Sequence, residues 1–160
     1  MRRIRIAANV AISGCLALIV FGLLLEVAAI PSVSTSLTST YEEYKGQLGT
    51  IQGILTALVG LGQITLALIA LLLNRVKNRK LLEPSSSRLT YLLALAIMLV
   101  AATLAGLTQW LISRNTLPPY LSIFLIASIL ICVIGALVTI ALTEVLKEAT
   151  SARQELESVI

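Results

Sequence analysis

Hydrophobic residues in this chain gather into four long runs that are separated by short polar stretches. A helix needs about 20 apolar residues to cross roughly 30 Å of hydrocarbon, and each run is at least that long. The runs are continuous rather than alternating, which argues against a transmembrane barrel. We therefore predict an all-α fold, an integral membrane bundle of four transmembrane helices that span about residues 6–30, 48–73, 89–112 and 121–142.

Composition supports the same class. The chain has 160 residues, of which 58% are hydrophobic and 12% charged, with a mean hydropathy of +0.97. Soluble domains carry about 25% charged residues. Four spans absorb nearly all of the chain, so we predict a single transmembrane domain and no separate soluble one. The first run continues past Cys15, which favours an uncleaved anchor over a secretory signal.

The distribution of cations predicts the orientation. Ten of the twelve Lys and Arg residues flank the runs on one side, and only Lys45 and Arg114 fall on the other. Because short cytoplasmic loops are rich in Lys and Arg, we expect both termini to be cytoplasmic. The same cations attract anionic lipid headgroups, at about 1 kcal/mol each. We therefore expect lipid, and not nucleic acid, to be the partner of these residues. The residues expected to contact lipid headgroups are Arg75, Lys77, Arg79 and Lys80.

Glu26 is the only acid inside a run and is therefore the candidate intramembrane ionisable residue. If Pro31 ends the first span, Glu26 lies about 6 Å below the helix end, where its side chain can reach the interface. An interfacial position and a role in proton or cation coupling both stay open. Seven hydroxyl residues in Ser32–Thr40 predict an exposed extracytoplasmic loop after Pro31.

Small residues mark candidate helix-packing faces. Gly49, Gly53 and Ala57 form a stripe that lets another backbone come close, and Gln63 can hydrogen-bond across the bundle. Cys15 and Cys132 each lie on a row of small residues at similar depth, so we expect the first and fourth helices to pack there.

The fourth run passes without a break into a charged tail, residues 143–160. Apolar residues recur there at spacings of three and four, so a helix extended into the cytoplasm would carry an apolar seam. The seam is too short for a free-standing coiled coil and needs another surface to bury it. The candidate partner-docking residues are Val145, Ala149, Ala152, Leu156 and Val159.

The sequence offers little chemistry. It contains no His and no Asp, and its two cysteines do not form a CxxC pair. These absences argue against His-metal sites and most catalytic triads, so we expect no enzyme activity and no cofactor.

The basic connection NRVKNRKLLEPSSSRLTYL, the short turn with Pro before the fourth helix, and the ending at Ala149, Glu155, Leu156, Val159 and Ile160 carry a resemblance to a known family. The chain resembles, over nearly its whole length, a bacterial family of four-helix membrane proteins called domain of unknown function 2975. The resemblance implies a protein of the bacterial cytoplasmic membrane, often encoded beside a small helix-turn-helix regulator. It brings no catalytic residues.

The sequence thus predicts a non-enzymatic integral membrane protein that serves as a subunit or regulatory partner of a bacterial membrane complex. Its partners would be anionic lipids and either copies of itself or another membrane protein. Two alternatives remain, a small transporter or pore, and a self-protection protein against a membrane-active peptide.

Overall fold

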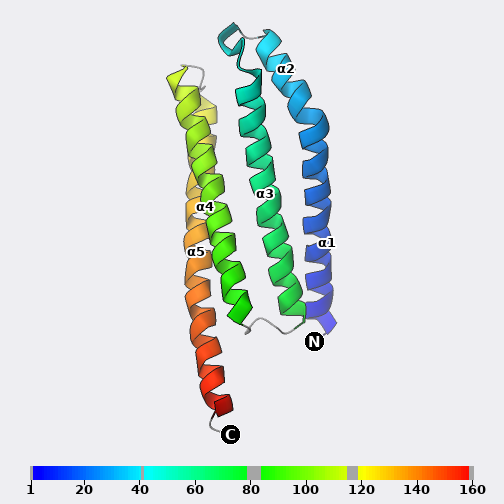
Figure 1. Ribbon diagram of the computed structural model, residues 1–160, viewed down its shortest axis with the longest axis vertical. Coiled ribbons are helices and arrows are strands. Elements are labelled where there is room, and N and C mark those ends of the chain that lie inside the picture. The colour runs from blue at the N-terminus through cyan, green and yellow to red at the C-terminus, as the bar shows by residue number, and fades with distance from the viewer. Residues whose placement is uncertain (1, 41, 79–83, 115–118, 159–160) are drawn as a thin grey trace.

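The computed structural model describes residues 2–40, 42–78, 84–114 and 119–158, and every long element in these ranges is helical (Figure 1). Four helices are long and apolar enough to cross a membrane, which confirms the predicted number of spans. The elements in chain order are α1 (Arg2–Leu24), η1 (Leu25–Ala29), α2 (Ile30–Thr40), η2 (Glu42–Tyr44), α3 (Leu48–Lys77), α4 (Pro84–Ser113) and α5 (Pro119–Ser158).

The first long helix does not end at Ile30, so the predicted loop over Ser32–Thr40 is wrong. The π-helical turn η1 links α1 to α2, and the candidate span runs without interruption over Ile6–Thr40, 35 residues. The hydroxyl groups that suggested a loop bond to carbonyls of the preceding turn. Ser34 Oγ, for example, donates to the Ile30 carbonyl at 2.6 Å and is completely buried. Such bonds satisfy Ser and Thr inside a helix.

Pro31 is accommodated by the π-helical turn that precedes it. A proline ring clashes with the carbonyl four residues earlier and supplies no N–H. In η1 the Ile30 N–H donates to the Leu25 carbonyl, five residues back rather than four. This wider turn lies directly before the ring, and the chain passes Pro31 as a helix.

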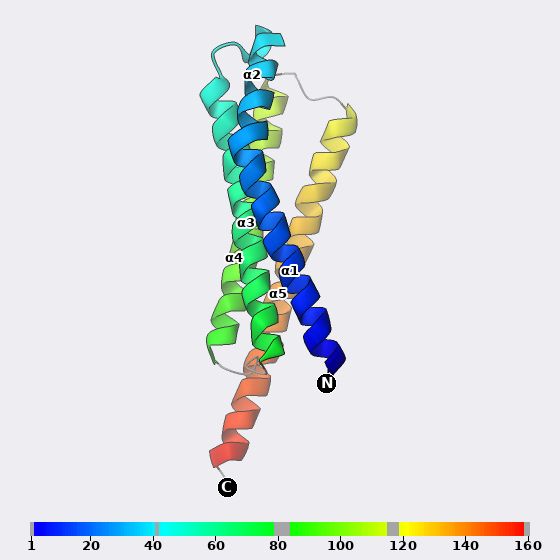
Figure 2. The same cartoon turned by 90° about the vertical axis from the view of Figure 1, so that its right-hand side faces the viewer.

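Helices α1, α3 and α4 lie side by side and α5 lies behind α4 (Figures 1 and 2), an open arrangement that we call the open row. Helix α1 packs on α3, α3 on α4, and α4 on α5. Among the described residues α1 and α5 are not a packed pair, so the expected packing of the first and fourth helices at Cys15 and Cys132 is wrong. Helices α4 and α5, which a short connection joins, are instead an antiparallel packed pair.

Small side chains fill the helix contacts, and large apolar ones cover the outside. Ala94, Ala101 and Ala136 are buried, together with Thr90 and Thr143. Long aliphatic side chains are exposed along every long helix. Lipid gives large apolar groups an environment as favourable as a protein core does, so close packing of small residues is the usual way that membrane helices associate.

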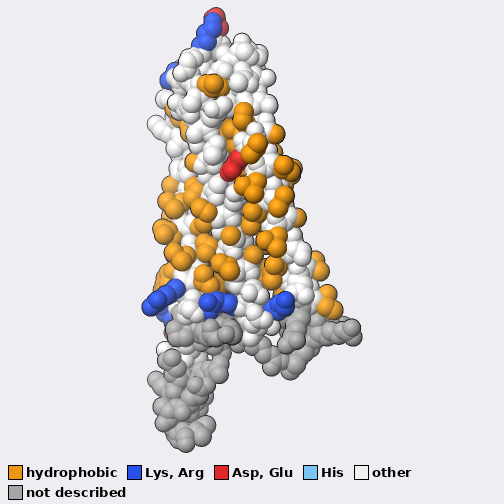
Figure 3. Space-filling view, turned by 45° about the vertical axis from the view of Figure 1, so that its right-hand side comes forward, with side chains coloured by type: hydrophobic (Ala, Val, Ile, Leu, Met, Phe, Trp, Pro, Cys, Tyr) orange, Lys and Arg blue, Asp and Glu red, His pale blue; other side chains and the backbone are white. Residues whose placement is uncertain are grey.

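The start of α1, the end of α3, the start of α4 and the end of α5 lie at one end of the row, which we call the terminal end (Figure 1). Basic side chains gather in a band there (Figure 3). Helix α5 continues to Ser158 and projects beyond the other helices (Figures 1 and 2), which confirms the predicted extension of the fourth helix. At the opposite end, Gly46 has a φ of 79°, a left-handed conformation that glycine adopts easily, in the turn before α3.

If Ser32–Thr40 is helical, cysteines placed at neighbouring positions of this segment should differ in their reactivity. In a background with Cys15 and Cys132 changed to Ala, a maleimide should react slowly with Ser34→Cys, which is buried, and quickly with Ser36→Cys, which is exposed. The measurement is the labelling rate of each variant in membranes. Equal, fast labelling of both positions would indicate a loop and contradict the helix.

Candidate functional site

The most unusual polar group of the molecule lies in the seam between α1 and α3. These helices run antiparallel, and at two positions a glycine of one helix faces a polar side chain of the other. A Cβ placed on Gly22 would lie 2.8 Å from Gln63 Nε2, and one placed on Gly60 would lie 3.7 Å from Glu26 Oε1. Gly22 therefore makes room for Gln63, whereas a Cβ on Gly60 would be in ordinary contact with Glu26, one helical turn away along the same seam. We call these four residues the seam site.

The Gln63 amide is poorly served by its surroundings. Its Nε2 atom is buried and has no hydrogen-bond partner among the described residues. The sequence suggested that this side chain bonds across the bundle, but the amide nitrogen faces Gly22 without an acceptor. Leaving a buried donor without a partner costs about 1 to 3 kcal/mol of stability. A hydrogen-bond acceptor next to Gln63 Nε2 would therefore stabilise the seam site.

Glu26 lies much deeper than the sequence suggested. Its expected distance of about 6 Å from the helix end assumed that the helix stops at Ile30, whereas the helix continues to Thr40. Thr40 is fourteen residues after Glu26, so Glu26 lies about 20 Å from that end of the helix. Its neighbour Gln63 is near the middle of α3, fifteen residues after Leu48 and fourteen before Lys77. An acidic side chain is visible among hydrophobic ones, far from the basic band (Figure 3).

This depth gives Glu26 its chemical interest. A charged side chain at the centre of a bilayer costs about 2.5 to 3.5 kcal/mol on insertion scales, and such residues usually face a partner or a cavity. Glu26 is half-buried, and its neighbour Val27 is 80% exposed. The arrangement can accept hydrogen bonds or pair with a cation in the middle of the apolar layer.

The terminal end holds two polar contacts that tie neighbouring helices. Arg75 donates to Ser85 Oγ at 2.5 Å and so joins α3 to α4. Arg75 and Lys77 are half-buried, while Arg79 and Lys80 lie outside the described residues. Contact of these four residues with lipid headgroups stays a prediction.

The second contact joins α4 to α5 and was not foreseen from the sequence. Tyr91 donates a short hydrogen bond to Glu144, and Lys147 Nζ donates to the Tyr91 hydroxyl at 2.6 Å. The Lys147 ammonium also lies 3.3 Å from the Glu144 carboxylate and 4.6 Å from the centre of the Tyr91 ring. The sequence gives no local signal for this cluster, because Tyr91 is more than fifty residues from both Glu144 and Lys147.

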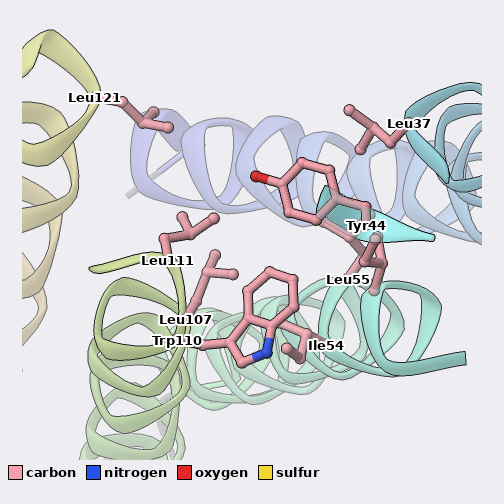
Figure 4. Close-up of a pocket in the computed structure, with 9 residues that line it drawn as sticks. Leu37, Tyr44, Ile54, Leu55, Leu107, Trp110, Leu111 and Leu121 are labelled. Carbon is pink, nitrogen blue, oxygen red and sulfur yellow. The ribbon is translucent and has the colours of Figure 1, made fainter. Parts of the chain in front are cut away.

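An apolar cavity of about 300 Å³ lies at the opposite end, between α2, α3, α4 and the start of α5 (Figure 4). Tyr44 and Trp110 stack in its wall with ring centres 5.9 Å apart, and Leu107 and Leu111 line it from α4. The Arg114 guanidinium lies 5.9 Å from the Trp110 ring centre. Such aromatic residues are typical of a membrane interface.

The predicted glycine stripe is not used within the chain. Gly49, Gly53 and Ala57 are all exposed, and nothing lies within 4 Å of a Cβ placed on either glycine. The prediction that this stripe packs in the bundle is therefore wrong for the chain by itself. Cys15 and Cys132 are free and half-buried, on helices that do not pack together.

The tail seam is uncovered as far as its side chains are described. Val145, Ala149 and Ala152 are exposed on α5. The side chain of Leu156 and the whole of Val159 lie outside the described residues. Docking of a partner on these five residues remains a prediction.

No group of three or more His, Cys, Asp or Glu residues that could hold a metal ion occurs within the described ranges. The seam site has one carboxylate and one amide, which is too few ligands for a typical metal centre. Its chemistry is therefore that of hydrogen bonding and charge pairing.

Comparison with known proteins identifies a family but not a function. A family model described as "Protein of unknown function (DUF2975)" matches residues 6–160. No curated protein and no solved structure matches the chain.

The α1–α3 seam predicts a specific cross-link. In the Cys15→Ala, Cys132→Ala background, Gly22→Cys and Gln63→Cys should form a disulfide in membranes treated with a permeant oxidant. The Cβ built on Gly22 is 3.2 Å from Gln63 Cγ, so the two Cβ atoms come within reach of a disulfide. Leu24→Cys with Gln63→Cys is the control, because Leu24 is 62% exposed. Cross-linking of the control pair in preference to the seam pair would contradict this register.

Proposed function

The chain belongs to the DUF2975 family of proteins of unknown function, and we propose that it acts as a non-enzymatic subunit or regulatory partner of a bacterial membrane complex. Its four long apolar helices make it a multi-pass membrane protein. The proposal concerns what such a protein does once it is in the membrane.

The open row of helices is the observation that carries this proposal. Within the described ranges α1 packs mainly on α3 and α5 mainly on α4, so a large part of the side surface of each is left to lipid or to other proteins. Transmembrane helices associate through close contacts of small and polar residues. The chain retains such residues unused, among them the exposed Gly49 and Gly53 and the half-buried Glu26.

The tail supports the same proposal from outside the apolar layer. Helix α5 extends beyond the other helices with Val145, Ala149 and Ala152 uncovered. Four acids and two cations follow from Glu144 onward, a balance that favours docking on protein over adhesion to anionic lipid. We propose that the tail seam, including Leu156 and Val159, docks on a partner.

The proposed location is the bacterial cytoplasmic membrane, with both termini inside. The cation count supports this orientation, since ten of twelve Lys and Arg residues flank the runs on the side of the termini. The Ser36→Cys variant described above also tests it, because an impermeant maleimide added outside intact cells should reach that position.

A small transporter or pore is the second candidate, and the depth of Glu26 favours it. Ionisable residues in the middle of a membrane often mark ion or substrate pathways. A single chain with an open row, however, does not surround a pathway. A second cavity, between α3 and α4, is lined by apolar residues, among them Leu61, Leu68 and Leu95. Transport would therefore require an assembly as well.

The subunit proposal predicts a complex larger than one chain after extraction from native membranes in mild detergent. A variant in which Asp replaces both Leu156 and Val159 should insert normally into the membrane. It should nevertheless be extracted as a single chain, because two charges would enter the docking seam. Ser151→Asp with Gln154→Asp is the matched control, as it adds the same charge on other faces of the tail helix.

Size-exclusion chromatography with light scattering measures the outcome. A wild-type chain that runs alone would contradict the subunit proposal, and ion conduction by that lone chain in vesicles would favour the transporter instead. A complex of unchanged size in the Asp variant would exclude the tail as the docking element.

A further inference from the structure

The π-helical turn leaves two hydrogen-bond acceptors of the same residue without an obvious donor. In an α-helix the Ile30 N–H would bond to the Glu26 carbonyl, but here it bonds to Leu25. In a π-helix the donor would be the next residue, which is Pro31 and has no N–H. Neither helical donor is therefore available to the Glu26 backbone carbonyl.

The Glu26 side chain repeats the situation. No hydrogen bond or ion pair to its carboxylate is found among the described residues, and the facing residue across the seam is Gly60. Gln63 on α3 has a buried donor without a partner, but its Nε2 faces Gly22, one turn away from Glu26. A neutral amide would in any case leave the carboxylate charge uncompensated.

The carboxylate can be approached from the side of the row. Glu26 is half-buried, and the residues that flank it in sequence, Leu25 and Val27, are half-buried and exposed. The structure thus presents a carboxylate, and a turn lacking one helical hydrogen bond, toward the interior of the membrane.

A second copy of this chain has no cation to offer at that depth. All twelve Lys and Arg residues lie outside the four apolar runs. A copy packed side by side would bring apolar residues, hydroxyls, amides or its own Glu26 to this carboxylate, but no cation. Charge complementarity therefore favours a different protein.

We propose that Glu26 is the docking point for a transmembrane helix of another protein that carries a Lys or Arg near the middle of its span. The ammonium or guanidinium has several N–H donors, enough for the carboxylate and for the unbonded carbonyl of the same turn. Pairing neutralises two charges that are each unfavourable alone in lipid, which makes the contact specific for that partner. This inference rests on the proposed role as a membrane subunit and names the chemistry of its partner.

Synthetic transmembrane peptides test the pairing with the full-length chain in phosphatidylcholine vesicles. The peptides are Trp-free Leu/Ala helices with uncharged ends, a dansyl group, and one central residue that is Lys, Gln or Leu. The protein has a single Trp, Trp110, whose energy transfer to dansyl reports binding. The Lys peptide should bind at least about tenfold more tightly than the Leu peptide, a difference worth about 1.4 kcal/mol.

Glu26→Gln should lower the affinity for the Lys peptide to that of the Gln peptide or below, while Glu42→Gln, which removes an exposed acid at the end of the row, should not. Circular dichroism checks that both variants keep their helices. Equal binding of the Lys and Leu peptides, or unchanged binding after Glu26→Gln, would overturn the inference. Self-association of the chain that depends on Glu26 in the absence of peptide would also overturn it, in favour of a second copy.

The native complex separates this inference from the proposed function. If the complex extracted from membranes survives Glu26→Gln intact, the subunit role stands and the Glu26 contact is excluded. If the wild-type chain is alone, the subunit role falls whatever the peptides do.

Discussion

Inside a bilayer every backbone polar group must find its partner within the protein, and this requirement shapes the chain from Arg2 to Thr40. The Ser and Thr residues of α2 can stay in a helix because their hydroxyls return to carbonyls of the preceding turn. Pro31 cannot donate, and the chain passes it through one π-helical turn. That turn is where the one acid of the apolar runs is found. The π-helical turn and the unusual side chain thus share one place, and such turns are frequent at functional sites.

The α1–α3 seam explains how the molecule tolerates these groups. Gly22 and Gly60 remove the side chains that would collide with Gln63 and leave space beside Glu26. The other helix contacts are built from Ala, Ser and Thr, which permit close approach without a polar residue of this kind. The row stays open because each helix uses a narrow face for its neighbour and presents large apolar residues elsewhere. An open row with an unmet acceptor is a natural component of a larger assembly.

Long-range pattern was readable from the sequence, whereas the local exceptions were not. The four apolar runs and the extension of the fourth helix past Leu142 follow directly from hydrophobic periodicity. Ser32–Thr40 was misread because seven hydroxyls and a proline are also what a loop contains, and only the back-bonding distinguishes the two.

The choice between glycine pairs was equally hidden. Gly49 and Gly53 have the spacing of a packing motif, yet the seam uses Gly22 and Gly60, which are 38 residues apart and have no local signature. The cluster of Tyr91, Glu144 and Lys147 depends on the register of α4 against α5, which no single helix encodes. Pairings between helices are therefore the part of this fold that the sequence alone leaves open.

A spin label beside the π-helical turn can measure whether Glu26 lies inside the hydrocarbon of the membrane. A nitroxide on Val27→Cys, in the background without native cysteines, lies beside Glu26 and faces away from the protein at 80% exposure, so it leaves the carboxylate in place. Power-saturation measurements in lipid vesicles compare its accessibility to oxygen and to a water-soluble nickel complex. We expect high oxygen and low nickel accessibility at this label. That result would indicate a position well inside the hydrocarbon and deeper than a label on Ser36. Nickel accessibility equal to that at Ser36 would place Glu26 at the membrane surface and contradict the account.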